Sequence, residues 1–310
     1  MEVSPWIAIL ATGIVAGIPI LLAALGEILA ERAGVINLGV EGMMLIGAVV
    51  GFMVSLQSNS PWVGLIAAVL AGAMMALIHA FLTITLRANQ VVSGLALTIF
   101  GTGLSGYLGK SFIGVPLTAT FKPVPVPGLS QIPAIGPIFF NHDLLVYIAY
   151  GLVALLWFFL FRTRSGLELR AVGENPAAAD AAGLNVFLIR YACVIAGGMF
   201  AGMAGAYLSL AYAPSWLENM TAGRGWIAVA LVIFGVWNPT KAFLGSFFFG
   251  TIDVLGFHMQ TLGIVVSSFF LKMLPYVFTI AVLIVATRET KTRRVAIPEA
   301  LGVPYVREER

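Results

Sequence analysis

The stretch GEILAERAGVINLGVEGMMLIGAVVG, residues 26–51, interrupts an apolar chain with charges and closely spaced glycines. The apolar run before it leads into Glu27, Glu31 and Arg32, and Glu41 follows before the apolar character resumes. A backbone of this kind is tolerated at membrane depth only where protein or water satisfies its polar groups. The stretch therefore predicts a packed, functional interior in a membrane protein.

The composition is that of an integral membrane protein. The 310 residues are 60% hydrophobic and 10% charged, with a mean hydropathy of +0.98, whereas soluble domains contain roughly 25% charged residues. Repeated apolar runs of about 17 to 25 residues favour helices over a barrel, whose strands would alternate in blocks of about ten. We therefore predict an all-α integral membrane fold, a polytopic bundle of about 8–10 transmembrane helices with interrupted helices. The single cysteine, Cys193, lies in an apolar run and implies no disulfide framework.

The apolar runs and the breaks between them predict the spans. They cover about 5–25, 39–56, 61–86, 91–108, 143–161 and 187–213, then two short pieces at 226–237 and 242–257, and a last run that ends near 287. The two short pieces are either two short spans or a re-entrant pair. Residues 1–287 thus form one transmembrane domain, and 288–310 form a polar tail. Because the first span has no basic n-region and no convincing cleavage site, we expect it to be retained.

The basic residues divide unevenly between the two sides of the membrane in this topology. Of the 17 Lys and Arg, 13 fall on one side, which the positive-inside rule makes cytoplasmic. The four on the other side are Lys110, Lys122, Arg224 and Lys272. The C-terminus and the connection 162–186 are then cytoplasmic, and the N-terminus and the proline-rich loop 110–142 are external. Membrane topology explains these scattered charges better than nucleic-acid binding does.

The cytoplasmic connection, RTRSGLELRAVGENPAAADAAGLNV at 162–186, contains signals for a short helix. Asn175 and Pro176 can begin it, because the N–H that proline lacks is not needed at the first helical position. The alanines that follow are strong helix formers, and Gly183 is a good stop. We predict a helix with a small-residue face on the inner membrane surface. It is either a docking element that seats closely in a partner's groove or a plain amphipathic connector.

Three stretches resemble one protein family and occur in the order expected for it. GENPAAADAAGLNV at 173–186 resembles the coupling-helix loop of ABC importer permeases, in the branch that carries sugars, nucleosides and branched-chain amino acids. ERAGVINLGVEGMMLIGA at 31–48 resembles the nucleoside and purine type of that branch, and GRGWIAVALVIFGVWNP at 223–239 resembles its late glycine-rich segment. The likeness extends over about 26–287, nearly the whole chain.

The resemblance implies a membrane subunit with no ATPase activity of its own. The sequence agrees, because it contains no GxxxxGK[ST] loop that could cradle ATP phosphates. ATP and Mg would then sit on a cytoplasmic ABC ATPase, and no cofactor would bind this chain. In this family the coupling helix docks on that ATPase, and the matching residues here are Glu174, Asn175, Pro176, Ala179 and Gly183. The resemblance further implies a prokaryotic inner-membrane location, a second permease subunit of the same or a related kind, and a substrate-binding lipoprotein at the external loop and the Trp216 region.

Several polar or aromatic residues near the spans are candidates for the substrate path: Asn37, Glu41, Asn89, Gln90, Ser93 and Trp226. An ionisable residue at membrane depth is a functional candidate by default, but we favour a structural role for Glu41, bonding exposed amides of the irregular segment before it. Asn37 is either a turn residue or a ligand contact. The three residues at the start of the fourth span could bond a ribose or a base, although an interfacial helix cap is the favoured role. Trp226 could stack on a base or be an ordinary apolar aromatic.

His79 and Asp253 lie within apolar runs far apart in the sequence. A metal site or a proton relay would need more ligands than either has nearby, so we expect satisfied interior polar residues and no metal. Glycine-interrupted segments also occur in both halves, at 34–51 and 223–250. In transporters, paired interrupted segments point to a central binding site.

The sequence therefore predicts the permease subunit of a prokaryotic ABC importer for nucleosides or related purine or pyrimidine compounds, with no covalent chemistry in this chain. The alternatives within the family are a simple-sugar or a branched-chain amino-acid permease. From other classes, an ion-coupled secondary transporter and a membrane-embedded structural subunit are the alternatives. Residues 26–51 would then form a gate or scaffold beside the substrate path.

Overall fold

The computed structural model describes residues 4–261, the single positions 270, 273, 277, 280, 281 and 284, and residues 297–307. Within these residues, six helical segments are long and apolar enough to cross a membrane. They are α1 (Pro5–Arg32), α2 (Val40–Ser58), α3 (Pro61–Ala80) with its π-helical continuation to Thr85, α4 (Gln90–Gly109), α6 (Leu144–Arg162), and α9 (Val186–Tyr207) with its π-helical continuation to Tyr212. The prediction of an all-α polytopic membrane fold is confirmed.

Four further helices lie between or after these long helices in the described residues: α7 (Arg164–Glu174), α8 (Pro176–Ala181), α10 (Arg224–Phe234) and α11 (Pro239–Thr261). The six long predicted spans coincide with the six long helices, and the two short predicted pieces coincide with α10 and α11. The last predicted span, which ends near 287, lies mostly outside the described residues. The first predicted span ended too early, because α1 continues past Leu25 and carries Glu27 and Glu31 within the helix.

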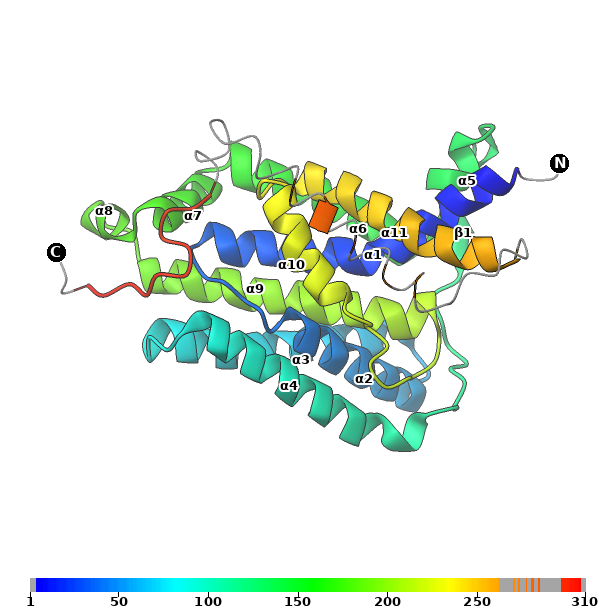
Figure 1. Cartoon of the computed structure of the whole chain (residues 1–310), viewed down its shortest axis with the longest axis horizontal. Helices are drawn as coiled ribbons and strands as arrows, with labels where there is room; N and C mark the ends of the chain where they lie inside the picture. The colour runs from blue at the N-terminus through cyan, green and yellow to red at the C-terminus, as the bar shows by residue number, and fades with distance from the viewer. Residues whose placement is uncertain are drawn as a thin grey trace.

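The bundle is organised around α1. Between Gly13 and Glu31, every residue of this helix except Val15 is buried. Its glycines let neighbouring backbones come close, as at Gly17, which lies against Ser246 of α11. In a membrane, helices associate through such close packing of small residues, because lipid gives no hydrophobic drive. Figure 1 shows α1 running beside α9 and α11, with α2, α3 and α4 layered beyond them.

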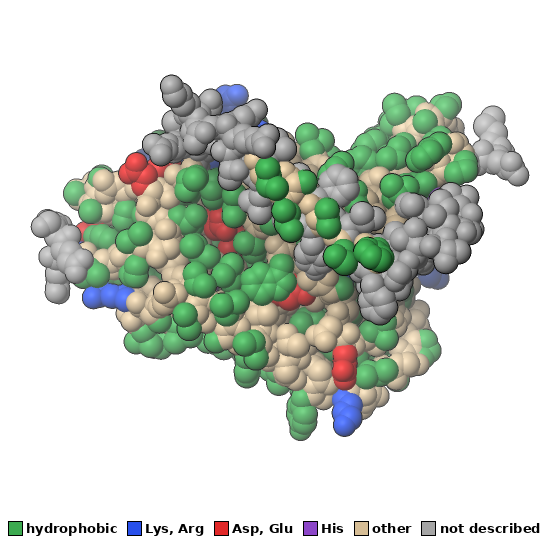
Figure 2. Space-filling view, in the orientation of Figure 1, with side chains coloured by type: hydrophobic (Ala, Val, Ile, Leu, Met, Phe, Trp, Pro, Cys, Tyr) green, Lys and Arg blue, Asp and Glu red, His purple; other side chains and the backbone are tan. Residues whose placement is uncertain are grey.

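Apolar side chains cover much of the outer surface. On α3 and α4 these include Ile66, Leu70, Met74, Val92 and Ile99, all largely exposed. Figure 2 shows hydrophobic groups and uncharged atoms over most of the visible face, with Lys and Arg only near its margins. Acidic groups also reach the surface in the middle of this face. This distribution fits a bundle whose flanks meet lipid and whose centre contains polar groups.

Two helices, α2 and α10, begin in the middle of the bundle. Gly42, in the first turn of α2, lies against Leu97 and Thr98, near the midpoint of α4. The start of α10 lies beside that of α2, since Gly225 is in contact with Glu41. With 11 residues, α10 is about 16 Å long, roughly half of the hydrocarbon thickness. The pair at 226–257, predicted as two short spans or a re-entrant pair, consists of this half-length helix followed by the longer α11 of 23 residues.

The two ends of the bundle carry different structures, as Figure 1 shows. At the end where α1 begins, residues 110–142 form a loop with two short paired strands, β1 (Pro123–Pro125) and β2 (Asn141–Asp143). The predicted loop is thus correct, although the short helix α5 (Ile135–Phe139) was not expected. Its Pro137 lies in the first turn, where proline costs no helical hydrogen bond.

The opposite end carries α7, α8 and the C-terminal segment 297–307. That segment packs on the bundle, because the Ala300 N–H donates to the carbonyl of Gly173 at 2.9 Å and the Gly302 N–H donates to the carbonyl of Gly34 at 3.2 Å. Arg190 is also buried there and donates to the carbonyls of Ala33 and Val303. The C-terminal segment and the connection 162–186 therefore lie at the same end of the molecule.

Candidate functional site

A single carboxylate joins the two helices that begin at mid-depth. Glu41, in the first turn of α2, accepts hydrogen bonds from the hydroxyl of Thr221 at 2.5 Å, the N–H of Gly223 at 2.8 Å and the N–H of Gly225 at 2.7 Å. Gly223 is the N-cap position of α10. The carboxylate thus supplies acceptors for N–H groups that a helix start leaves without intrahelical partners.

The local sequence of the late segment suits this contact. The N-terminus of a helix carries a partial positive charge, which a carboxylate stabilises. Gly223 adopts a φ of +82°, in the left-handed region that glycine enters without cost. At Gly225, an added Cβ would lie within 2.6–2.8 Å of atoms of Glu41. Glycine at this position lets the α10 backbone approach the α2 backbone closely enough for the carboxylate to reach it.

Many backbone groups of the non-helical segment between α1 and α2, residues 33–39, also have polar partners within the protein. The Asn37 N–H donates to Glu27 at 2.9 Å, and the Ile36 N–H donates to Gln90 at 2.7 Å. The Ile36 carbonyl lies 2.9 Å from His79 Nε2, and further carbonyls accept from Thr98, Arg190 and Gly302. Buried backbone groups of this kind need partners within the protein.

The residues predicted for the substrate path have internal roles in this arrangement. The bonds of Glu41 come from the late glycine-rich segment and not from the segment before α2, so the predicted partner amides were wrong. Asn37 accepts from the N–H of Gly39 at 3.0 Å, as a turn residue does. Asn89 is the N-cap of α4, Gln90 accepts a hydrogen bond from the Ile36 N–H, and the Ser93 hydroxyl is hydrogen-bonded to His79. Trp226 is half-buried in the first turn of α10.

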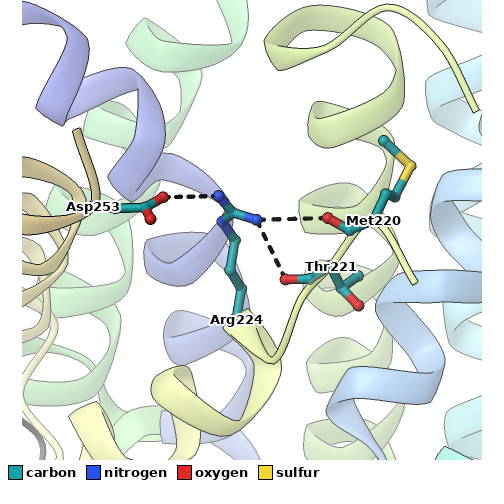
Figure 3. A network of polar contacts seen from close by, with 4 residues as sticks. All are labelled: Met220, Thr221, Arg224 and Asp253. Atoms are coloured by element: carbon teal, nitrogen blue, oxygen red, sulfur yellow. Dashed lines mark hydrogen bonds and ion pairs between the residues drawn. The ribbon is translucent and has the colours of Figure 1, made fainter. Parts of the chain in front are cut away.

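A second polar group lies next to the Glu41 junction. Arg224, at the first position of α10, forms an ion pair with Asp253 of α11, with Nη2 and Oδ2 at 2.9 Å. Its Nη1 makes longer contacts to the carbonyls of Met220 and Thr221, at 3.5 and 3.4 Å (Figure 3). The Tyr212 ring lies 5.5 Å from the guanidinium carbon. Arg224 was predicted among the external loop charges, whereas the structure places it within the bundle.

The sequence signal that could have placed Arg224 correctly is its position between two glycines at the start of a half-length apolar piece. His79 and Asp253 were expected to be satisfied interior residues, and both have partners here. Among the residues that the structure describes, no three His, Cys, Asp or Glu side chains cluster closely enough to hold a metal ion.

The far end of α10 is fixed to the end of α1. The Trp237 indole N–H donates to Glu31 at 2.5 Å, and Arg32 donates to the carbonyls of Val236 and Trp237 at 3.4 Å. Val236 and Trp237 adopt φ values of 55° and 50°, which are unusual for residues with side chains. This elbow between α10 and α11 therefore depends on two charged side chains of α1 that the sequence placed beyond the first span.

The short helix predicted within the connection 162–186 is present as α8. Asn175 caps α8 through a 2.9 Å bond from the Ala178 N–H, Pro176 occupies its first turn, and Gly183 ends it with a φ of +87°. Ala179, however, is only 4% exposed and packs in a cluster with Val172, Val186 and Tyr305. Its side chain anchors α8 to its own chain and is not presented to a partner. The exposed side chains of α8 and its end are Ala177, Ala178, Ala181 and Ala182.

A bundle of apolar helices, with broken helices meeting at mid-depth and a small-residue helix exposed at one end, is the architecture of a transport permease. Residues 9–287 match the family described as branched-chain amino acid transport system / permease component, and the chain belongs to this family. It is 43% identical to a putative glucose ABC transporter permease protein of Haloferax volcanii, over 93% of this chain and 94% of the relative. No solved structure matches it.

Two other relatives are named for nucleosides. The chain is 36% identical to the guanosine ABC transporter permease protein of Bacillus subtilis, over 94% of each chain, and 36% identical to a nucleoside ABC transporter permease protein of Lactococcus lactis, over 96% of each chain. The chain is thus a permease subunit of an ABC transporter and not itself an enzyme. Such a subunit works with an ATPase and a substrate-binding protein, so an ion-coupled secondary transporter is set aside.

The Glu41 junction leads to a test by stability. Replacing Glu41 with Gln should lower the free energy of unfolding by about 2 to 4 kcal/mol. The two carboxylate oxygens of Glu41 accept three hydrogen bonds, whereas Gln offers a single uncharged oxygen to the same three donors. Thermal unfolding of the purified protein in detergent, followed by circular dichroism, measures this change. The control is Glu218→Gln, since Glu218 is exposed in the same connecting segment. Equal unfolding temperatures for the two variants would contradict the assigned role of Glu41.

Proposed function

We propose that this chain is the membrane permease of an ATP-driven importer for nucleosides or related purine or pyrimidine compounds. The observation that carries the transport role is the pair of helices that begin at mid-depth around Glu41, since interrupted helices of this kind build substrate sites in transporters. Nucleosides are supported by two relatives named for guanosine and nucleoside transport at 36% identity, and by the stretch 31–48. A simple sugar is the second candidate, because a relative at 43% identity is named for glucose.

The proposed mechanism transmits ATPase closure through α8. ATP and Mg bind the partner ATPase, and its closure moves α8 and the adjoining α7. A cavity of about 480 Å³ lies between α7 and the α10–α11 elbow, and its lining residues include Arg32, Glu174 and Lys241. Gly173 of α7 lies against the Arg32 backbone, and the Arg32 side chain donates to the carbonyls of the elbow. A movement of α7 would therefore reach the elbow through Arg32, and α10 would carry it to the junction at mid-depth. Access then alternates between the two sides of the membrane.

The orientation follows from the charge distribution. The end with α7, α8 and residues 297–307 faces the cytoplasm, and the end with β1 and β2 faces outside, as the positive-inside rule requires. The substrate-binding lipoprotein docks on the external loop and on the segment around Trp216. Trp216 itself is buried, so exposed neighbours such as Leu217 and Glu218 supply the contact. The substrate path runs between this chain and a second permease subunit of the same or a related kind.

Uptake assays test the substrate. The permease, its ATPase, its second permease subunit and its binding protein are expressed together in cells that lack nucleoside and glucose uptake. We expect ATP-dependent accumulation of radiolabelled guanosine that unlabelled nucleosides suppress and unlabelled glucose or leucine does not. Accumulation of labelled glucose, with no effect of nucleosides, would replace the nucleoside assignment by the sugar alternative.

Docking through α8 is tested with a bulky side chain on its exposed face. Replacing Ala178 with Trp should weaken ATPase binding by roughly tenfold or more, which corresponds to about 1.4 kcal/mol, because close seating of the small-residue face is lost. Co-purification of the ATPase and substrate uptake measure the effect. The control is Ile99→Trp on α4, a position that is 74% exposed on an apolar flank. If ATPase binding and uptake were unchanged in Ala178→Trp, α8 would not be the docking element.

A further inference from the structure

The ion pair between Arg224 and Asp253 is unusual because it is partly exposed inside the membrane part of the chain. The Arg224 side chain is 14% exposed and the Asp253 side chain is 27% exposed. Arg224 directly precedes Gly225, which touches Glu41 at the mid-depth start of α2. Charged groups at this depth are very costly against lipid and instead face protein or a water-filled space. The surface that bears this pair is therefore turned away from lipid, and its partial exposure leaves the pair open to a ligand.

Both members of the pair retain hydrogen-bonding capacity. Asp253 uses Oδ2 for Arg224, and its Oδ1 has no hydrogen-bond partner among the residues that the structure describes. Arg224 Nη1 makes two long contacts of 3.4 and 3.5 Å, at the upper limit for a hydrogen bond. Figure 3 shows Arg224 at the start of α10 reaching Asp253 of α11 through one carboxylate oxygen, with no contact drawn to the second oxygen.

The chemistry of the pair selects a kind of ligand. A carboxylate accepts hydrogen bonds from hydroxyl groups, and a guanidinium donates to their oxygens. Two neighbouring hydroxyls on one ring offer both donors and acceptors to such a pair. The pair carries no net charge, so it favours a neutral ligand over an ionic one. The Tyr212 ring beside the guanidinium helps to hold Arg224 in place.

We propose that Arg224 and Asp253 form the contact for neighbouring ring hydroxyls of the transported substrate, the hydroxyls of a ribose or another sugar ring. This inference rests on the proposed function and deepens it. It also explains how one permease family can include relatives named for glucose and for guanosine, because both molecules carry adjacent hydroxyls on a ring. The purine or pyrimidine would then be recognised elsewhere along the path.

The test compares substrates that differ by one hydroxyl. The complete transporter takes up guanosine or 2′-deoxyguanosine at concentrations that saturate the binding protein, so that loading of that protein does not differ. We expect the normal transporter to prefer guanosine. Asp253→Asn should lower guanosine uptake by roughly tenfold or more and 2′-deoxyguanosine uptake much less, so that the preference approaches unity. Arg224→Lys should shift the preference in the same direction. The control is Glu168→Gln, which removes an exposed ion pair with Arg164 on α7 and should leave the preference unchanged.

A purely structural role is separated by exchanging the two charges. The double variant Arg224→Asp with Asp253→Arg restores an ion pair between α10 and α11 but exchanges the places of donor and acceptor. The proposal expects complexes that still assemble but do not recover the preference for guanosine. Recovery of both uptake and preference would overturn it, as would equal losses for the two substrates in Asp253→Asn.

A second set of substrates separates a failure of the nucleoside assignment from a failure of the proposed hydroxyl contact. If the normal transporter carries no nucleosides, the proposed function fails, and the same variants are compared with glucose and 2-deoxyglucose. A loss of preference for glucose would still support the hydroxyl contact. An unchanged preference in both substrate sets would overturn the contact, whatever the substrate class.

Discussion

Satisfying backbone polar groups in the middle of a membrane is the constraint on which the rest of this structure depends. A helix that begins at mid-depth exposes N–H groups for which lipid offers no acceptor. Here the carboxylate of Glu41 meets that need for α10, while Glu27, Gln90 and Thr98 satisfy the segment before α2. Because these groups are satisfied within the chain, broken helices can lie at the centre of an apolar bundle. The broken helices in turn bring charged side chains to that depth.

The same arrangement links the two ends of a transport cycle. α10 runs from the Glu41 junction to the elbow at Trp237, which is held by Glu31 and Arg32. Arg32 also lines the cavity shared with α7, next to α8. The 11-residue helix α10 thus lies between the elbow, near the proposed docking surface, and the polar group at mid-depth. In the proposed mechanism, this helix and its two fixed ends carry the movement of the ATPase to the substrate path.

Much of the fold could be predicted from local sequence signals. Hydropathy located the long helices, and the order of Asn175, Pro176 and Gly183 identified α8 and its limits. Each of these signals depends on a few neighbouring residues, so no knowledge of the tertiary structure was required. The stretch that carries Glu41 was also correctly recognised as one whose polar groups needed partners.

The remaining features depend on contacts between distant parts of the chain. The partners of Glu41 lie at Gly223 and Gly225, more than 180 positions away, and nothing in the local pattern selects them over nearer amides. Ala179 faces inward because Tyr305, in the C-terminal segment, helps to form its pocket. Arg224 resembled a loop-end charge because the loop before α10 enters the bundle. Such features follow from packing and not from hydropathy or capping.

The central claim is that a carboxylate holds two broken helices together at mid-depth. An experimental structure of the assembled transporter, determined at a resolution that places side chains, tests it most directly. The account predicts that the Glu41 carboxylate lies within hydrogen-bonding distance of the amides of Gly223 and Gly225, close to the 2.8 and 2.7 Å found here. A Glu41 side chain turned away from α10, with the start of that helix paired to other groups, would contradict it.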